Sequence, residues 1–411
     1  MNIVEDLESR GLVADKVDEL PKIFSKPRTV YFGIDPTADS AQVGNLAVIL
    51  LMKRLGLAGN KLIFLVGGAT GMIGDPREKG ERSLLDSRTL ASNTRAIKRQ
   101  LKKILGKTPF TMVDNANWLT RVKLIPFLRD IGKYFTVNDL IKRDIIRKRL
   151  ETPNESISYT EFTYALLQGY DYLTLNEKYG CNLQVGGSDQ WTNMLSGVDL
   201  IRKKKGEQAY AISIPLVTDI SGKKFGKSEG NAIWLDSKKT SPFAFYQFWI
   251  NLPDDGLETY LKYYTFLSIV EIQALMVLHE RNPGERSAQN ALASRVTEIV
   301  HGKAVAQAVA QASNALFGST HFSALSADAR KIVQKEAPTL HVDANVTVIE
   351  ALTKSGLAGS KNDARRLIEG KGVSLNGVLV EADTEIKSTA FENNMALLKK
   401  GKRDILVLIL K

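Results

Sequence analysis

Short β-rich runs alternate with helical patterns along the first half of this 411-residue chain. The β-rich runs are TVYFGI, KLIFLVGGATG, CNLQVGGSDQ and AYAISIPLV, and a helical pattern follows the first of them from about Gly44. This alternation predicts an α/β fold, a parallel sheet with crossover helices. Ligands bind such sheets at the carboxyl ends of the strands, so the glycine-rich segments there are expected to converge on one crevice.

The rest of the chain predicts further domains. The segment around WLTRVKLIPFLRDIGKYF has helical apolar spacing and several aromatics, so it either packs on its own domain or forms a subunit interface. The pattern turns helical from about Thr240. The expected boundaries are a parallel-sheet domain over 1–222 with an insertion at about 115–150, a helical domain over 223–318, a linker over 319–346 and a small α+β module over 347–411.

The charge balance points to a polyanionic partner. The formal net charge is +11, and the excess gathers in RAIKRQLKK, KRDIIRKR, RKKK and KKGKR. Any one such cluster is commonly a solvated helix face, but four on one chain favour RNA or DNA.

Other bulk features predict a cytoplasmic protein. One cysteine, Cys181, permits no internal disulfide. No apolar run reaches the ~20 residues needed to span a bilayer, so no membrane partner is expected. The acidic residues in MNIVEDLESRGL do not suit a signal or transit peptide.

The four histidines, 279, 301, 321 and 341, all lie beyond the glycine-rich half. Acid–base catalysis by histidine and a histidine-rich metal site are therefore excluded from the expected crevice, and no metal ligands are assigned. A reaction that depends on positioning and charge stabilisation, such as phosphoryl or nucleotidyl transfer, fits these residues.

Two glycine-rich segments resemble familiar nucleotide motifs without matching them. In SGKKFGKSEG only three residues separate Gly222 from Gly226, whereas a P-loop needs four, so a loop that brings lysines onto phosphate is favoured. In GGATGMIGD the glycine spacing does not fit the dinucleotide fingerprint, which excludes a dehydrogenase. This backbone can instead approach a ligand closely, with Asp75 at its end.

In YALLQGYD, three polar residues stand at helical spacing. Tyr164, Gln168 and Asp171 share one face of a helix. The face is either solvated or the wall of a pocket, and the apolar surroundings favour the pocket.

Five motifs together resemble those of bacterial-type tyrosyl-tRNA synthetases. YFGIDPTADSAQVGN, GGATGMIGDP, FTYALLQGYD, LQVGGSDQW and KFGKS occur in that family's order, and SKNDARRLIEGKGVSLNGVLV resembles its small S4-type RNA-binding domain. The resemblance covers essentially the whole chain. It implies a class I enzyme with a Rossmann-like catalytic domain, a helical anticodon-binding domain and an S4-like module.

The resemblance also implies substrates and roles. ATP with Mg²⁺ would activate tyrosine, the tyrosyl group would pass to tRNA(Tyr), and the chain would form a homodimer. Tyrosine would be bound by Tyr31, Asp75, Tyr164, Gln168, Asp171 and Gln190. The nucleotide would contact Gly33, Asp35, Gly44, Gly187 and Asp189. Catalysis, mainly on the phosphates, would involve Thr37, Gln42, Asn45, Lys79, Arg82, Lys224, Lys227 and Ser228.

The chain departs from the family pattern at three places, and one of them is the segment between Asp75 and Arg82, which is one residue shorter than in many relatives. Gln42-Val43-Gly44-Asn45 stands where relatives often have His-x-Gly-His, and Phe32 replaces a small residue that can touch the ribose. The expectation is that both carboxamides replace the histidines as neutral donors.

Two other functions remain open at this point. An RNA-binding paralogue with reduced catalysis would also explain the missing histidines and the basic clusters. Tryptophan as substrate is a third possibility, although Tyr31 with Asp171 suits a hydroxyl better than an indole.

Overall fold

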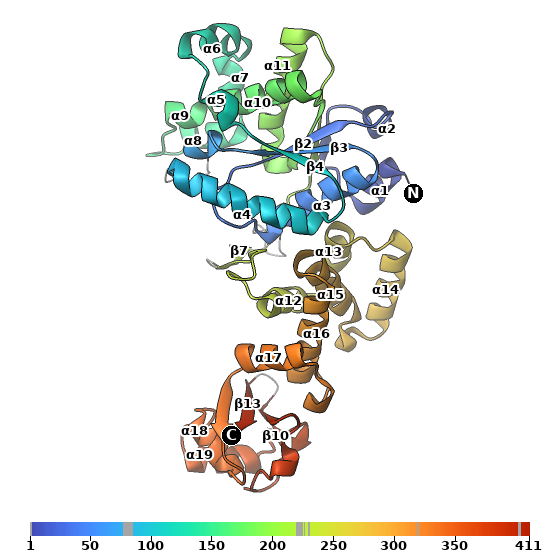
Figure 1. Ribbon diagram of the computed structural model, residues 1–411, viewed down its shortest axis with the longest axis vertical. Helices are drawn as coiled ribbons and strands as arrows, with labels where there is room; N and C mark the ends of the chain where they lie inside the picture. The colour runs from blue at the N-terminus through green and yellow to red at the C-terminus, as the bar shows by residue number, and fades with distance from the viewer. Residues whose placement is uncertain are drawn as a thin grey trace. The chain divides into compact units, whose positions relative to one another are not determined.

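The computed structural model of the chain describes residues 2–76, 85–218, 225, 227–228, 231–318, 320–401 and 404–411, and Figure 1 shows its elements. The chain divides into two compact units. The first contains Met1–Thr240 and Pro253–Ala288, and the second contains Ser241–Leu252 and Gln289–Lys411. No helix among the described residues combines the length and the apolar character that crossing a membrane requires.

A six-stranded sheet of order β1-β6-β5-β2-β3-β4 forms the centre of the first unit. All neighbours are parallel except β1, which pairs antiparallel with β6. The parallel sheet expected from the sequence is therefore confirmed. The strands are β1 (Asp15–Lys16), β2 (Thr29–Ile34), β3 (Lys61–Val66), β4 (Phe110–Asp114), β5 (Leu183–Gly187) and β6 (Tyr210–Ile214).

Helices cover both faces of this sheet (Figure 1). One face carries α3 (Val43–Leu57) and α4 (Ser87–Leu105), and the other carries α10 (Tyr164–Tyr179) and α11 (Trp191–Lys205). Ten of the 15 residues of α3 are buried, whereas α4 buries only one face. A helix that is apolar nearly all round belongs in the interior, and an amphipathic one belongs at the surface.

The segment between β4 and α10 is helical, as its apolar spacing predicts. It contains α5 (Ala116–Leu119), α6 (Leu124–Asp130), α7 (Val137–Ile141), α8 (Asp144–Glu151) and α9 (Tyr159–Phe162). Trp118 and Ile131 join the core of the sheet domain. Several large apolar side chains stay exposed, namely Leu124, Ile125, Val137, Leu150 and Tyr159, at 54–73%.

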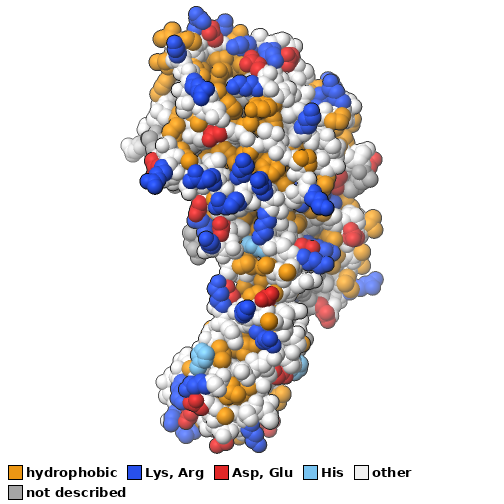
Figure 2. Space-filling view, in the orientation of Figure 1, with side chains coloured by type: hydrophobic (Ala, Val, Ile, Leu, Met, Phe, Trp, Pro, Cys, Tyr) orange, Lys and Arg blue, Asp and Glu red, His pale blue; other side chains and the backbone are white. Residues whose placement is uncertain are grey.

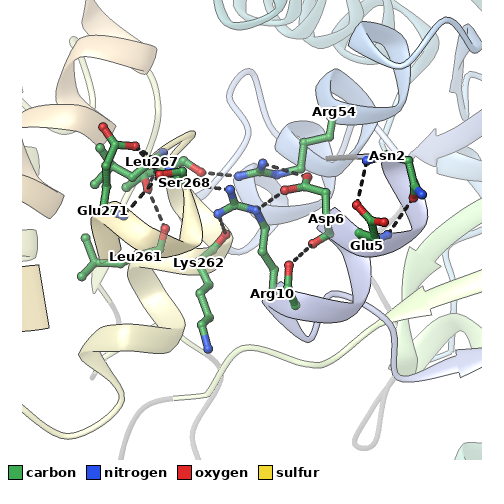
Figure 3. Close-up of polar contacts among 12 residues, drawn as sticks. Asn2, Glu5, Asp6, Arg10, Arg54, Leu261, Lys262, Leu267, Ser268 and Glu271 are labelled. Atoms are coloured by element: carbon green, nitrogen blue, oxygen red, sulfur yellow. Dashed lines mark hydrogen bonds and ion pairs between the residues drawn. The ribbon is translucent and has the colours of Figure 1, made fainter. Parts of the chain in front are cut away.

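An arginine network joins the first helix, α1 (Ile3–Arg10), to α3 and to the end of α13 (Leu257–Tyr264), as Figure 3 shows. Asp6 accepts hydrogen bonds from Arg10 Nε at 2.7 Å and Arg54 Nη1 at 3.1 Å. Arg10 Nη2 then donates to the Leu267 carbonyl at 2.7 Å, and Arg54 donates to Thr265. This network fixes α13 against α3. The first unit also contains α2 (Leu20–Ile23), α14 (Ile269–Arg281), β7 (Lys227–Ser228) and β8 (Asn231–Ala232).

The second unit combines helices with a five-stranded sheet of order β11-β10-β12-β13-β9. Its helices are α12 (Pro242–Ile250), most of α15 (Ser287–His301), α16 (Lys303–Phe317), α17 (Ala327–Glu336), α18 (Val348–Lys354) and α19 (Lys361–Glu369). Its strands are β9 (Thr339–Val342), β10 (Val373–Leu375), β11 (Val378–Leu379), β12 (Met395–Lys400) and β13 (Asp404–Leu410).

Two boundaries differ from the expected ones. The stretch 319–346, expected as a linker, contains α17 and β9, and β9 pairs in parallel with β13, so the C-terminal sheet includes residues from Thr339 onward. The expected helical domain is divided, because α13 and α14 belong to the first unit and α12 and α16 to the second. The pairing of β9 with β13 and the division of the helical domain depend on long-range packing, which local patterns do not show.

Candidate active site

The sheet opens at its centre. From β2 the chain proceeds outward to β3 and β4, and then returns to form β5 and β6 on the other side of β2. A crevice is expected where the order reverses. The β2 and β5 strands pair only at Val30–Leu183 and Tyr31–Gln184, although both continue further. The two strands therefore separate directly after Tyr31, and the crevice is expected there.

Asp171 of α10 lies at the bottom of this crevice, 2% exposed. Trp118 Nε1 donates to one of its oxygens at 2.7 Å, and Asn115 Nδ2 donates to the other at 2.9 Å. Burial raises the pKa of Asp171 to about 7, although the two donors act in the opposite direction. The carboxylate is thus held in one orientation by the insertion.

Two buried polar atoms nearby have no hydrogen-bond partner among the described residues. They are the Tyr31 hydroxyl and Gln184 Oε1, which lie on neighbouring strands in direct register. Burial, as the main cause, holds the pKa of Tyr31 well above its ordinary value, so its hydroxyl keeps its proton. Because buried polar groups are normally paired, this donor and this acceptor indicate a place where a polar ligand atom belongs.

A chain of hydrogen bonds forms the wall of the crevice. The Tyr164 hydroxyl donates to Asp35 Oδ2 at 2.8 Å, and the Thr70 hydroxyl donates to Asp35 Oδ1 at 2.8 Å. Asn115 Nδ2 also donates to Thr70 Oγ1 at 2.9 Å, which joins the wall to the bottom. Gly67 is required here, because a Cβ at this position would collide with the Asp35 carboxylate.

Asp75 is fixed by amides from the opposite side. Gln190 Nε2 donates to Asp75 Oδ2 at 2.8 Å, and Asn193 Nδ2 donates to Asp75 Oδ1 at 3.1 Å. Arg143 in turn donates to Asn193 Oδ1 at 2.8 Å. Gln168 is half-buried and lies on α10 between Tyr164 and Asp171, which confirms that these three residues share one helix.

The start of α3 presents Gln42 and Asn45 to the same edge of the sheet. Asn45 Oδ1 accepts the Gln42 backbone N–H at 3.2 Å, and this hydrogen bond caps the helix. No partner is present for Asn45 Nδ2 among the described residues. The cap therefore orients the amide so that its donor remains available.

The lysine segment is only partly described. Lys79, Arg82 and Lys224 lie outside the described residues, and Lys227 and Ser228 are described only as backbone of β7. Phe225 is buried, and its ring stacks on Tyr260 with centroids 4.6 Å apart. A Cβ on Gly44 would lie 3.8 Å from the Phe225 carbonyl oxygen. The backbone of Phe225 therefore lies beside the start of α3.

The remaining predicted nucleotide contacts also follow the central strands. Gly33, Thr37, Gly44 and Asp189 are exposed, and Gly187 is half-buried at the end of β5. A Cβ added to Gly33 would meet nothing within 4 Å, so a ligand can approach the backbone there. The described residues contain no group of three or more His, Cys, Asp or Glu that could bind a metal ion.

Several residues of the crevice were not predicted as site residues from the sequence. Thr70, Asn115, Trp118, Gln184 and Asn193 act through contacts with residues distant in the chain, which local spacing does not reveal. A weak signal existed for Trp118, because a buried indole N–H usually needs an acceptor.

Comparison with known proteins agrees with this geometry. Residues 25–318 match the family "tRNA synthetases class I (W and Y)", and residues 328–408 match "Tyrosine--tRNA ligase SYY-like C-terminal domain". The chain is 44% identical over 420 residues to a tyrosine–tRNA ligase of Lactococcus lactis, covering 99% of this chain and 100% of that one. It is 41% identical over 407 residues to tyrosine–tRNA ligase 1 of Vibrio parahaemolyticus, covering 98% and 97%.

Solved structures give the same result. A C-terminally truncated mitochondrial tyrosyl-tRNA synthetase of Aspergillus nidulans aligns with a TM-score of 0.67 and 35% identity, over 75% of this chain and 92% of that one. The family match covers more than half of the chain, and the full-length relatives are more than 40% identical to it. The chain belongs to the tyrosyl-tRNA synthetases of the class I tRNA synthetase family.

Proposed function

We propose that the crevice binds tyrosine with its phenol at Tyr31 and Asp171, activates it with ATP and transfers it to the 3′ end of tRNA(Tyr). The observation that supports this placement is the buried hydroxyl of Tyr31, which has no hydrogen-bond partner among the described residues and interacts electrostatically with the buried acceptor Asp171. Tyr31 would donate to the phenolic oxygen, and Asp171 would accept the phenolic proton. Phenylalanine would leave both groups buried and unpaired. The placement is tested by comparing the activation of phenylalanine with that of tyrosine in variants of these two residues.

The tyrosine ammonium group would lie between Asp75, Tyr164 and Gln168. Because the Tyr164 hydroxyl gives its proton to Asp35, its oxygen can accept a hydrogen bond from the ammonium. Asp75 supplies negative charge, and Gln190, which donates to that carboxylate, keeps it in position. These contacts would aim the tyrosine carboxylate toward the phosphate-binding side of the crevice.

ATP would occupy the edge formed by the ends of β2 and β5 and the start of α3. The tyrosine carboxylate attacks the α-phosphorus, and the bond to the departing pyrophosphate breaks. No proton has to move in this step, so donors and cations suffice. Gly33, Asp35, Gly44, Gly187 and Asp189 would contact the nucleotide, and Thr37, Gln42, Asn45, Lys79, Arg82, Lys224, Lys227 and Ser228 would stabilise the phosphates.

Mg²⁺ would arrive with ATP, bound to the phosphate oxygens. The second reaction takes place at the same site, where a ribose hydroxyl at the tRNA 3′ end takes the tyrosyl group from the adenylate. The helical segment within 223–318 and the module ending at 411 would bind the rest of the tRNA. The setting would be the cytoplasm, where a reduced Cys181 is expected.

Tyr31→Phe and Asp171→Asn are each expected to weaken the preference for tyrosine over phenylalanine by roughly 1–3 kcal/mol, the cost of one lost buried hydrogen bond. The measurement is kcat/KM for each amino acid in ATP–pyrophosphate exchange. Tyr172→Phe is the matched control, because Tyr172 is equally buried but donates to the Tyr210 carbonyl away from the crevice. Unchanged discrimination in Tyr31→Phe and Asp171→Asn would show that the phenol binds elsewhere.

Tyrosine affinity is expected to fall as the pH drops below about 7. Burial raises the pKa of Asp171 to about 7, so its carboxyl gains a proton in that range and loses an acceptor for the phenolic proton. Below this pKa the affinity should decrease about tenfold per pH unit at most. Equilibrium dialysis with tyrosine from pH 5 to 8 measures it. Asp171→Asn should bind weakly but without this pH dependence, and a dependence retained in that variant would assign it to another group.

We also propose a homodimer formed through the insertion, because its large apolar side chains would otherwise stay in water. Leu124 and Ile125 are 68% and 72% exposed. Sedimentation at micromolar concentration should show a dimer, and Leu124→Glu with Ile125→Glu should convert it to monomer. Val270→Glu on α14 is the control, since Val270 is 74% exposed outside the insertion. A monomeric parent chain would contradict this proposal.

A further inference from the structure

The exposed face of α4 carries cations without acidic partners. Seven exposed basic residues lie on this helix or directly after it: Arg88, Arg95, Lys98, Arg99, Lys102, Lys103 and Lys107. The helix itself contains no Asp or Glu, and Asp86 precedes it as the N-cap. Within the described parts of the chain none of the seven forms an ion pair, and the Asp236 carboxylate acts on Lys103 at a distance. We call these seven residues the α4 basic face.

This pattern differs from that of other exposed cations in the same unit. Lys16 pairs with Glu19 at 2.5 Å, Lys22 with Asp18 at 2.6 Å and Arg202 with Asp199 at 2.9 Å. An ordinary solvated face mixes both signs of charge in this way. On α4, like charges instead stand four residues apart at Arg95–Arg99 and Lys98–Lys102. Like charges at this spacing destabilise an isolated helix.

The face is held in a fixed orientation. Leu90, Ile97, Leu101, Ile104 and Leu105 are buried on the opposite side of α4. Figure 2 shows Lys and Arg side chains gathered along this helix at the surface. From Arg88 to Lys103 the charges extend over roughly 22 Å at the α-helical rise of about 1.5 Å per residue. Several phosphates of one RNA strand fit along such a length.

We propose that the α4 basic face binds the phosphate backbone of folded RNA without reading its sequence. The face offers only cations, and no aromatic side chain stands on α4 to stack on a base. Contacts to phosphate position an RNA and supply salt-dependent affinity, whereas contacts to bases would give specificity. The natural ligand is tRNA, and this identity rests on the proposed function.

The structure also weakens another basic cluster as an RNA site. In KRDIIRKR, Arg149 is buried and pairs with Glu161 at 2.8 Å, while Arg143 donates to Asn193 beside Asp75. Two of its cations are therefore used inside the protein. The α4 basic face keeps all of its charges available.

The test compares two triple variants of the full chain that lose the same charge. Arg95→Gln, Lys98→Gln and Lys102→Gln change the α4 basic face, and Lys16→Gln, Lys22→Gln and Lys26→Gln form the matched control. Binding of a tRNA(Tyr) transcript and of an unrelated RNA hairpin of similar length is measured by filter retention at several salt concentrations. Circular dichroism checks that both variants fold.

The α4 variant should bind both RNAs roughly 10²–10³-fold more weakly at 0.1 M salt if all three side chains contact phosphate, and the slope of log K against log salt should decrease by about 2–3. The control should bind like the parent chain. No loss in the α4 variant, an equal loss in the control, or a loss for tRNA(Tyr) alone would overturn the proposal. Tyrosine-dependent ATP–pyrophosphate exchange should be unchanged in the α4 variant. If the parent chain lacks exchange, the proposed function fails, but the RNA measurement still decides this inference.

Discussion

A chain that ends at Ala337 is expected to form tyrosyl-adenylate at the full-length rate, while kcat/KM for tRNA falls roughly 10²–10³-fold. Every described residue assigned to the crevice lies in the first unit, and the truncation removes only the end of the second. The truncation deletes three exposed basic side chains of α19, namely Lys361, Arg365 and Arg366. Loss of about three phosphate contacts costs a factor of this size near 0.1 M salt.

The position of the truncation matters. A chain cut at residue 346 would keep β9 without its partner β13 and would expose a strand edge that invites aggregation. The Aspergillus nidulans relative was crystallised in a C-terminally truncated form, so such a removal left a folded protein in that case. Single-turnover adenylation and tRNA charging separate the two activities. An equal loss of adenylate formation and of tRNA charging would contradict the proposal that the removed residues serve only to bind tRNA.

The second large effect is expected for Asn45→Ala, which should slow adenylation about 10²–10³-fold with little change in tyrosine affinity. Asn45 Nδ2 has no partner among the described residues and lies at the start of α3, where the helix dipole favours phosphate. Removal of one donor to the transition state typically has this cost. Pre-steady-state adenylate formation measures the rate, and tyrosine binding measures the affinity.

Asn45 also caps its helix, and a second variant separates the two roles. Asn45→Asp keeps an oxygen that can accept the Gln42 N–H but removes the amide donor. It should therefore be as slow as Asn45→Ala while retaining the thermal stability of the parent, whereas the alanine variant should lose about 1 kcal/mol, the net contribution of one ordinary hydrogen bond. A fully active aspartate variant would reduce Asn45 to a helix cap.

The sheet was predictable because its strands and helices have local sequence patterns. Short β-rich runs predicted β2, β3, β5 and β6, and helical spacing placed Tyr164, Gln168 and Asp171 together on α10. The chain order of these elements then placed the crevice at the carboxyl ends of the strands.

What the sequence could not reveal depends on contacts between distant residues. The basic run KRDIIRKR gave no sign that Arg149 is buried against Glu161, because the two are brought together by the fold of the insertion. Gln184 lies within a quoted motif but received no role until its register with Tyr31 placed both unpaired atoms in one crevice. Strand β9 was missed because four residues carry a weak signal, and its partner β13 comes more than 60 residues later.

The central claim is that this crevice activates tyrosine, and ATP–pyrophosphate exchange in the absence of tRNA tests it most directly. The purified chain with ATP and Mg²⁺ should exchange pyrophosphate when tyrosine is present, and far less with phenylalanine or tryptophan at equal concentration. In the same assay Tyr31→Phe should narrow the gap between tyrosine and phenylalanine, because the crevice loses a donor that only tyrosine can use. No tyrosine-dependent exchange, or exchange that favours tryptophan, would contradict the account.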